Sequence, residues 1–174
     1  MGGKKLKILD IGCGTGEYSL MLQEIGHEVI AVDLSEEAIK KAKEIGVKNA
    51  FVADLLSEPE TNLFDIVLVK GFSPLNTDDI GKFINVWNKI KDLLKVDGIA
   101  IYWGSTNFTS RWSESGWFNW DPDNLNSILV TQVFFAFRYQ ASIPWVINNI
   151  ISTIAKKIRA NRNLTLIGYS KKEF

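Results

Sequence analysis

The sequence predicts an α/β domain built on a doubly wound, mostly parallel β-sheet. Short apolar segments alternate with amphipathic segments through the first 103 residues, and glycine or aspartate follows most of the apolar ones. Continuous apolar strands that alternate with helices are typical of a parallel sheet covered on both faces. A chain of 174 residues that is 46% hydrophobic is long enough for one core and too short for two ordinary domains. We therefore expect residues 1–174 to form a single domain.

Five strands and three helices are expected before residue 104. The strands are the apolar runs Leu6–Ile11, Val29–Val32, Asn49–Ala53, Phe64–Val69 and Gly98–Trp103. Helical spacing of apolar residues predicts helices over Gly16–Ile25, Ser35–Lys43 and Thr77–Leu94. Capping residues and acids in the first turn support the second and third of these helices.

The pattern changes after Gly104. Residues 105–122 are rich in Ser, Asn, Gly and Trp without a clear period, which predicts a long loop. A strand is expected at Val133–Tyr139, while 124–132 fits a helix or a strand. An apolar stripe after Pro144 predicts an amphipathic helix. Leu164–Tyr169 is the last expected strand.

Composition limits the classes of function. The 20 basic and 20 acidic residues cancel, so no strong nucleic-acid signal is present. The single cysteine allows no internal disulfide, which favours a cytoplasmic protein. The chain begins without the apolar region of a secretory signal, and its apolar stretches fall short of the roughly 18 residues of a membrane span. We expect a cytoplasmic protein with no membrane span.

The glycine-rich turn after the first strand is the first sign of chemistry. Residues 10–16 read Asp-Ile-Gly-Cys-Gly-Thr-Gly, and ligands of open α/β sheets bind beyond the carboxyl ends of the strands. A dinucleotide site would need a third glycine five residues after Gly12, but Glu17 stands there and would repel a pyrophosphate. Asp10 and Glu17 make the turn acidic, which suits a ligand that carries an ammonium and a sulfonium.

With three later segments, this turn resembles the class I S-adenosylmethionine-dependent methyltransferases over residues 6–103. Residues 10–16 look like their first motif, and Ala-Val-Asp-Leu-Ser at 31–35 looks like the acidic end of their second strand. Ala-Asp-Leu at 53–55 is similar to their adenine-contacting turn, and Phe-Asp-Ile-Val-Leu-Val at 64–69 to their fourth strand. The resemblance implies a Rossmann-like, seven-stranded sheet with an antiparallel last strand, and S-adenosylmethionine as the cofactor.

The resemblance also implies roles in the donor site. The glycines would let the backbone approach the methionine moiety, Asp33 would accept hydrogen bonds from the ribose hydroxyls, and Leu34 would pack on adenine. Asp54 and the backbone of Leu55 would read the adenine edge. The expected donor-binding set is Asp10, Gly12, Cys13, Gly14, Gly16, Asp33, Leu34, Asp54, Leu55 and Lys70. Each has a plainer alternative, namely a tight turn for the glycines, a helix cap or turn for the acids, and simple space filling for Cys13.

Methyl transfer makes modest demands on side chains. It is an in-line displacement on an activated carbon, so the protein mainly positions the reactants and excludes water. We expect no metal, and no catalytic residue can be assigned. The only histidine, His27, is expected at the opposite end of the sheet, which excludes a histidine base. Lys70, Tyr102 and Asp78 are within reach, each more typical of a structural or orienting role than of a base.

The acceptor is less well defined. Ser73-Pro-Leu differs from the motif of methyltransferases that act on exocyclic amines of nucleobases, which argues against that class. The order of elements after residue 133 loosely resembles methyltransferases of small molecules such as sugars, lipids or related metabolites. Aromatic side chains near the transfer position either line an acceptor pocket or pack in the core. The candidate substrate-binding residues are Phe72, Trp103, Trp112 and Trp117.

Two expectations concern what covers the site. The segment 104–122, with Trp112, Trp117 and Trp120, is expected to be a mobile cover over the acceptor side. The resemblance implies helices before the first strand that cover the donor, but only about five residues precede Leu6, so we expect these helices to be missing. The donor site is then open, covered by a partner chain or a second copy of this chain, or belongs to a shortened chain.

An active small-molecule methyltransferase is our first hypothesis, and a non-catalytic donor-binding accessory subunit is the second. Glu17 opposes a third, a nicotinamide oxidoreductase.

Overall fold

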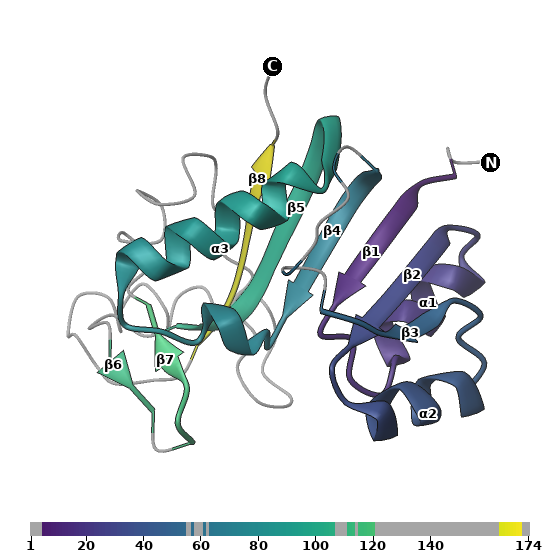
Figure 1. The fold of residues 1–174 in the computed structure, drawn as a ribbon, viewed down its shortest axis with the longest axis horizontal. Coiled ribbons are helices and arrows are strands. Elements are labelled where there is room, and N and C mark those ends of the chain that lie inside the picture. The colour runs from purple at the N-terminus through teal and green to yellow at the C-terminus, as the bar shows by residue number, and fades with distance from the viewer. Residues whose placement is uncertain are drawn as a thin grey trace, which may run out of the picture.

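The computed structural model describes residues 5–54, 57, 61, 63–106, 111–113, 115–120 and 164–171. Six described strands form one sheet in the order β3-β2-β1-β4-β5-β8 (Figure 1). Neighbouring strands are parallel except β8, which pairs antiparallel with β5. The predicted mostly parallel sheet with an antiparallel last strand is confirmed. The strand predicted at 133–139 and the helix predicted after Pro144 lie outside the described residues.

The elements follow the predicted order, with small differences at their ends. The strands of the sheet are β1 (Lys7–Ile11), β2 (Glu28–Asp33), β3 (Ala50–Val52), β4 (Phe64–Lys70), β5 (Leu94–Thr106) and β8 (Leu164–Lys171). The helices are α1 (Glu17–Glu24), α2 (Glu36–Glu44), the 3-10 helix η1 (Ser73–Leu75) and α3 (Ile80–Asp92).

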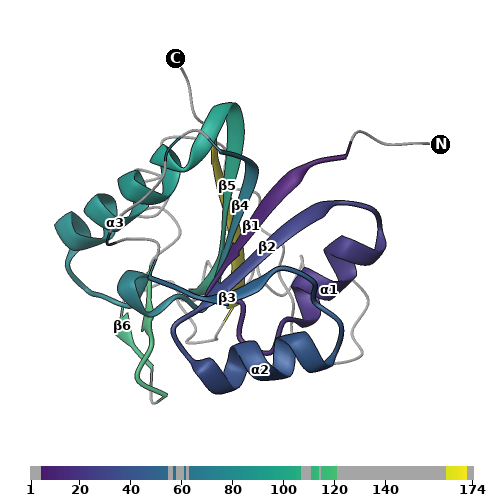
Figure 2. The same ribbon diagram turned by 45° about the vertical axis from the view of Figure 1, so that its right-hand side comes forward.

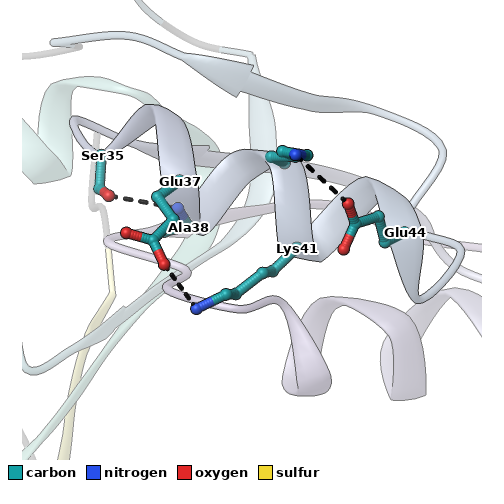
Figure 3. A network of polar contacts seen from close by, with 6 residues as sticks. Ser35, Glu37, Ala38, Lys41 and Glu44 are labelled. Atoms are coloured by element: carbon teal, nitrogen blue, oxygen red, sulfur yellow. Dashed lines mark hydrogen bonds and ion pairs between the residues drawn. The ribbon is translucent and has the colours of Figure 1, made fainter.

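Side-chain caps fix where two of the helices begin. The Ser35 hydroxyl accepts a hydrogen bond from the Ala38 amide at 3.2 Å, and Glu37 pairs with Lys41 at 2.7 Å on the next turn of α2 (Figure 3). Asp79 caps α3 in the same way, by accepting bonds from two amides of the first turn. Each cap satisfies amides that a helix leaves unpaired. The third helix therefore begins after Asp79 and not at Thr77.

The helices cover both faces of the sheet. In Figures 1 and 2, α1 and α2 lie on one face and α3 lies on the other. The main core lies between the sheet and α3, where Phe83, Trp87 and Ile90 are fully buried. A smaller apolar cluster lies under α2, around Ile39 and Ala42. No helix in the described parts of the chain is long and apolar enough to cross a membrane.

The region predicted as a long loop contains a β-hairpin. Strand β5 continues to Thr106, and two short strands follow, β6 (Arg111–Trp112) and β7 (Phe118–Asn119), paired antiparallel. Figure 1 shows the hairpin beside the carboxyl end of β5. The loop prediction was wrong for these residues, because strands of two residues are too short to produce an apolar period.

The hairpin is fastened to the segment before α3. The Asn76 side chain accepts a hydrogen bond from the Phe118 amide at 2.8 Å and donates one to the Gly116 carbonyl at 3.0 Å. Trp120, which follows the hairpin, is 4% exposed and packs edge-on against Phe83 and Phe118. Trp120 is thus a core residue and not part of a cover, since Phe83 of α3 and Phe118 of β7 provide its packing surface.

Candidate functional site

The turn between β1 and α1 depends on left-handed glycines. Gly12, Gly14 and Gly16 have φ angles of 69°, 56° and 84°, a region that other residues rarely adopt. A Cβ on Gly16 would lie 2.8 Å from the Cβ of Ala42, so this glycine also lets α2 approach the turn. A Cβ on Gly14 would meet nothing within 4 Å. The middle of the turn therefore borders open space, where a ligand can approach the backbone.

Asp33, at the end of β2, holds this turn in place. Its Oδ2 accepts a hydrogen bond from the Gly14 amide and its Oδ1 accepts one from the Ser35 amide, both at 2.9 Å. The Val32 carbonyl accepts two further bonds from the amides that begin the turn, at 2.8 and 3.0 Å. Each carboxylate oxygen retains a second acceptor position. Asp33 therefore fixes the turn and is still able to accept hydrogen bonds from a ligand.

A cavity of about 250 Å³ lies beside the turn, at the carboxyl ends of the strands. Its walls come from the turn, the end of β2, the segment after β3 and the segment after β4, and include Gly12, Asp33, Leu34, Asp54, Phe72 and Pro74. No lysine, arginine or histidine is among the described lining residues. The cavity thus offers acids and apolar surface, which suits an uncharged or cationic ligand better than a phosphate.

Asp10 lies at the base of the turn. It is 2% exposed, and its Oδ2 accepts a hydrogen bond from the Ser19 hydroxyl at 2.6 Å. Burial raises the pKa of Asp10, although the Ser19 hydrogen bond and the positive charge of Lys70 act in the opposite direction. A buried carboxylate of this kind gains when a cation is placed near it.

Three residues from different elements meet near Asp10, and the charge of one of them, Lys70, opposes the rise that burial causes in the pKa of Asp10. The Lys70 ammonium at the end of β4 lies 4.0 Å from the centroid of the Tyr18 ring and 5.3 Å from that of Trp103. The two rings contact each other edge-on at 5.0 Å. Tyr18 comes from the first turn of α1 and Trp103 from β5, where it is the register partner of Lys70. We call these residues the Lys70 cluster.

The structure separates the predicted substrate-binding residues. Phe72 lines the cavity and lies against Gly12, whereas Trp103 belongs to the Lys70 cluster. Trp112 and Trp117 lie on the hairpin, 48% and 37% exposed, and neither is among the described residues of the cavity wall. The four predicted aromatic residues therefore lie in three separate places, namely the cavity wall, the Lys70 cluster and the hairpin.

The predicted donor-binding residues are mostly brought together. Gly12, Asp33, Leu34 and Asp54 line the cavity, Gly14 and Gly16 shape the turn beside it, and Asp10 lies beneath the turn. Leu55 lies outside the described residues. Burial and the nearby acids raise the pKa of Cys13 to about 12, so its thiol stays protonated near neutral pH and is a poor nucleophile.

The residues considered as general bases differ in burial and in their contacts. The Tyr102 side chain packs between the sheet and α3 and is 7% exposed. Burial raises the pKa of Tyr102 to about 12. Tyr102 is therefore not a general base that can reach an acceptor. Asp78 accepts a hydrogen bond from Trp112 Nε1 at 3.2 Å, an orienting contact. His27 lies at the amino end of β1, where its Nδ1 accepts a hydrogen bond from the Leu6 amide at 3.4 Å. The predicted exclusion of a histidine base agrees with this position.

The sequence did not single out Tyr18, Ser19 or Asn76. Tyr18 and Ser19 could have been found, because a helix that starts directly after a glycine turn places its first residues over the strand end. Asn76 carries no such signal, since its partners on the hairpin are 40 and 42 residues away in the sequence.

Fold and site together define the class of protein. The open α/β sheet binds at its carboxyl edge, the turn exposes backbone there, and an acid at the end of β2 faces a cavity without basic residues. These features define an open α/β domain with a ligand site at its carboxyl edge, whose walls suit an uncharged or cationic ligand. In the described part of the chain no cluster of His, Cys, Asp or Glu could hold a metal ion.

The chain belongs to the methyltransferase domain family, which its sequence matches over residues 8–98. The ribosomal protein L11 methyltransferase of Alkaliphilus metalliredigens is 36% identical over 101 residues, or 57% of this chain and 31% of that protein. The malonyl-(acyl-carrier protein) O-methyltransferase of Hamiltonella defensa is 46% identical over 57 residues, or 33% of this chain and 21% of that protein. The chain thus spans less than a third of these curated relatives.

The fold is shared with solved structures at lower identity. The structure of an S-adenosylmethionine-dependent methyltransferase from Methanosarcina mazei has a TM-score of 0.69 at 16% identity, with 99% of this chain and 95% of that chain covered. S-adenosylmethionine is accordingly the cofactor of this domain.

Proposed function

We propose that this chain transfers a methyl group from S-adenosylmethionine to a small-molecule acceptor such as a sugar, a lipid or a related metabolite. The observation that carries the donor part is the cavity between the glycine turn and Asp33. The two curated relatives described above are named for a protein acceptor and an acyl-carrier-protein acceptor. The acceptor class is therefore the part of the proposal that most needs a test.

In the proposed donor complex, the adenosine half occupies the cavity. Asp33 accepts hydrogen bonds from the ribose through the oxygen positions that its two backbone bonds leave available. Leu34 and Asp54 line the part of the cavity assigned to the adenine. Phe72 closes the opposite wall, which extends the donor site beyond the residues that we predicted for it.

The donor supplies an activated methyl group, so the chain contributes position and a dry environment. Asp10 provides a negative charge at the base of the turn for the cationic methionine half. No described side chain at the carboxyl edge stands out as a general base, because Tyr102 is buried beneath α3 and Asp78 makes an orienting contact, the hydrogen bond from Trp112. We infer that the acceptor reacts without a histidine or cysteine of this chain.

Two observations favour a small acceptor over a nucleobase. Residues 73–75 form the 3-10 helix η1, and Leu75 is buried in the core. Leu75, the last residue of the segment that differs from the base-modifying motif, thus serves packing. The balanced charge of the chain also offers little attraction for a nucleic acid.

A non-catalytic, donor-binding accessory subunit remains the second candidate function. The absence of a recognisable acceptor motif in the sequence motivates it. A partner chain or a second copy of the chain would then complete the site. The cytoplasmic location and this partnership remain predictions.

An acceptor screen with methyl-labelled S-adenosylmethionine tests the proposal. Pools of sugars, lipids, small carboxylic acids, bulk protein and RNA are incubated with the protein, and incorporation into each is measured against the Asp33→Ala variant. Label in a small-molecule pool that depends on Asp33 supports the proposal. Label only in protein or RNA would contradict the acceptor class, and donor binding without label in any pool would favour the accessory subunit.

A further inference from the structure

Two asparagines at the hairpin differ in whether their side-chain amides are paired. The Asn76 amide is bonded at both ends, because it accepts a hydrogen bond from the Phe118 amide and donates one to the Gly116 carbonyl. Asn119 of β7 is 1% exposed, and among the residues that the structure describes neither its Oδ1 nor its Nδ2 has a hydrogen-bond partner. A buried amide without partners gives up its hydrogen bonds to water and regains none. The fold therefore accounts for the Asn76 amide but not for the Asn119 amide.

The Asn119 side chain projects away from the aromatic residues of the core under α3. Trp120 packs edge-on against Phe83 and Phe118, so Phe118 and Trp120 lie on the same face of β7. Side chains alternate along a strand, which places Asn119 on the other face. Its low exposure means that this face is covered as well. The amide is thus enclosed at a place where no described side chain bonds to it.

Strand β7 lies beside the part of the carboxyl edge that the proposed donor cavity leaves open. The walls of the cavity come from the ends of β1 and β2 and from the segments after β3 and β4. Strand β7 instead contacts β5, and Figure 1 shows the hairpin beside the carboxyl end of that strand. In an in-line displacement the acceptor approaches the methyl group from the side opposite the rest of the donor. The β5 side, which carries Asn119, is therefore the side for an acceptor.

An unpaired side-chain amide selects the group that binds to it. It presents N–H donors and a carbonyl acceptor side by side. A carboxylate would satisfy the N–H but would place a second acceptor against the carbonyl, and an ammonium would leave the N–H unpaired. Two hydroxyl groups on adjacent carbons satisfy both ends of the amide, because one accepts a hydrogen bond while the other donates one. The Asn119 amide is thus complementary to a neutral pair of hydroxyl groups.

We propose that Asn119 binds the methyl acceptor through two hydroxyl groups on adjacent carbons, as a sugar or another polyol provides them. Its Nδ2 donates a hydrogen bond to one hydroxyl oxygen, and the second hydroxyl donates one to its Oδ1. This inference rests on the proposed function and narrows the acceptor from small molecules to polyhydroxylated ones. Asn119 orients the acceptor and takes up no proton, because an amide is not a base near neutral pH.

The same substitution at the two asparagines tests the inference. Wild type, Asn119→Val and Asn76→Val are compared by chemical denaturation and by their calorimetric affinity for S-adenosylhomocysteine. Methyl transfer from labelled S-adenosylmethionine is then measured at increasing concentrations of a pool of sugars and sugar alcohols. A second pool holds deoxy analogues of the same sugars that lack adjacent hydroxyl groups. Valine is used because it is apolar, is close to asparagine in size and is favoured in strands.

We expect the two variants to differ in stability and in acceptor binding. Asn119→Val keeps at least the denaturation midpoint of wild type, because it removes an unpaired buried amide. Its affinity for S-adenosylhomocysteine is unchanged, while its apparent KM for the sugar pool rises roughly 5- to 100-fold with a smaller change in kcat. Asn76→Val lowers the midpoint, because it removes the two hydrogen bonds that fasten the hairpin. Wild type labels the sugar pool roughly tenfold or more above the deoxy pool.

Other outcomes overturn the inference. An unchanged apparent KM in Asn119→Val, or label that enters only pools without adjacent hydroxyl groups, would refute the contact and leave the donor site intact. If Asn119→Val does not fold, the wild-type comparison decides, because equal labelling of the two pools contradicts the inference and a preference for the sugar pool supports it. Binding of S-adenosylhomocysteine without label in any pool would instead refute the catalytic part of the proposed function, and this inference with it.

Discussion

The two ends of the carboxyl edge are built on different principles. On the β1–β3 side, the turn, Asp33 and Ser35 are joined by hydrogen bonds between residues at most 19 positions apart. On the β5 side, the hairpin is held by Asn76 and Asp78 through contacts that span 34 to 42 positions. The glycine turn thus depends mainly on hydrogen bonds between neighbouring elements, whereas the hairpin depends on contacts between distant segments.

The largest expected effect tests the packing on the β5 side. Trp120→Ala should lower the free energy of unfolding by about 3 to 5 kcal/mol, because it empties a core position between Phe83 and Phe118. Trp117→Ala, at a 37% exposed position of the hairpin, should cost less than about 1 kcal/mol. Chemical denaturation of both variants measures the difference. Similar losses for the two would show that the hairpin packs as core throughout.

Two glycines of the turn sharpen the comparison on the donor side. Gly16→Ala should cost about 2 to 4 kcal/mol, because the new methyl group combines a left-handed backbone with a clash against Ala42. Gly14→Ala should cost about 1 to 2 kcal/mol of backbone strain alone, since its Cβ meets only open space. The same denaturation assay applies, and equal costs would mean that α2 can withdraw from the turn.

We expect the Asp10→Asn substitution to raise the stability of the protein and to lower its affinity for the donor. Its pKa is raised by burial, so the stabilisation present below its unfolded pKa is lost as the pH rises through the folded pKa. The asparagine side chain keeps an acceptor for Ser19 and escapes that loss, so the stability of Asp10→Asn relative to wild type should improve as the pH rises above about 4. Its affinity for S-adenosylhomocysteine should fall, because the ammonium loses its counter-charge. If the free energies of unfolding of wild type and Asp10→Asn change in parallel with pH, the pKa of Asp10 is not raised by folding.

The smallest effect is expected at the opposite edge of the sheet. His27→Gln should leave methyl transfer within about twofold of wild type, because His27 contacts the Leu6 amide at the amino end of β1. Initial rates on an acceptor identified by the screen provide the measurement. A hundredfold loss would contradict the placement of the site.

The contrast between the two sides also explains what the sequence could predict. The order of the strands, the positions of α1 and α2, and the gathering of Gly12, Asp33 and Asp54 around one cavity follow from apolar periodicity and from capping and turn residues. Those signals are local. The hairpin, the burial of Tyr102 and Trp120 and the placement of Lys70 between two rings depend on partners that are far apart in the sequence.

Sequence reasoning also assigned single roles to residues that have two. Asp33 was predicted to meet a ribose, but both of its oxygens also hold backbone amides of the site. Phe72 was predicted on the acceptor side, and it lines the cavity that we propose for the donor. Side-chain direction at a strand end decides such cases, and the residue after a strand has no fixed alternation from which to read it.

The central claim is that the cavity between the glycine turn and Asp33 binds the methyl donor. Calorimetric titration of the wild-type chain and of Asp33→Ala with S-adenosylhomocysteine, and of the wild-type chain with NAD, tests it most directly. We predict that S-adenosylhomocysteine binds, that NAD does not, and that Asp33→Ala weakens binding by roughly 1.5 to 3 kcal/mol while remaining folded. Unchanged affinity of a folded Asp33→Ala variant, or preferential binding of NAD, would contradict the account.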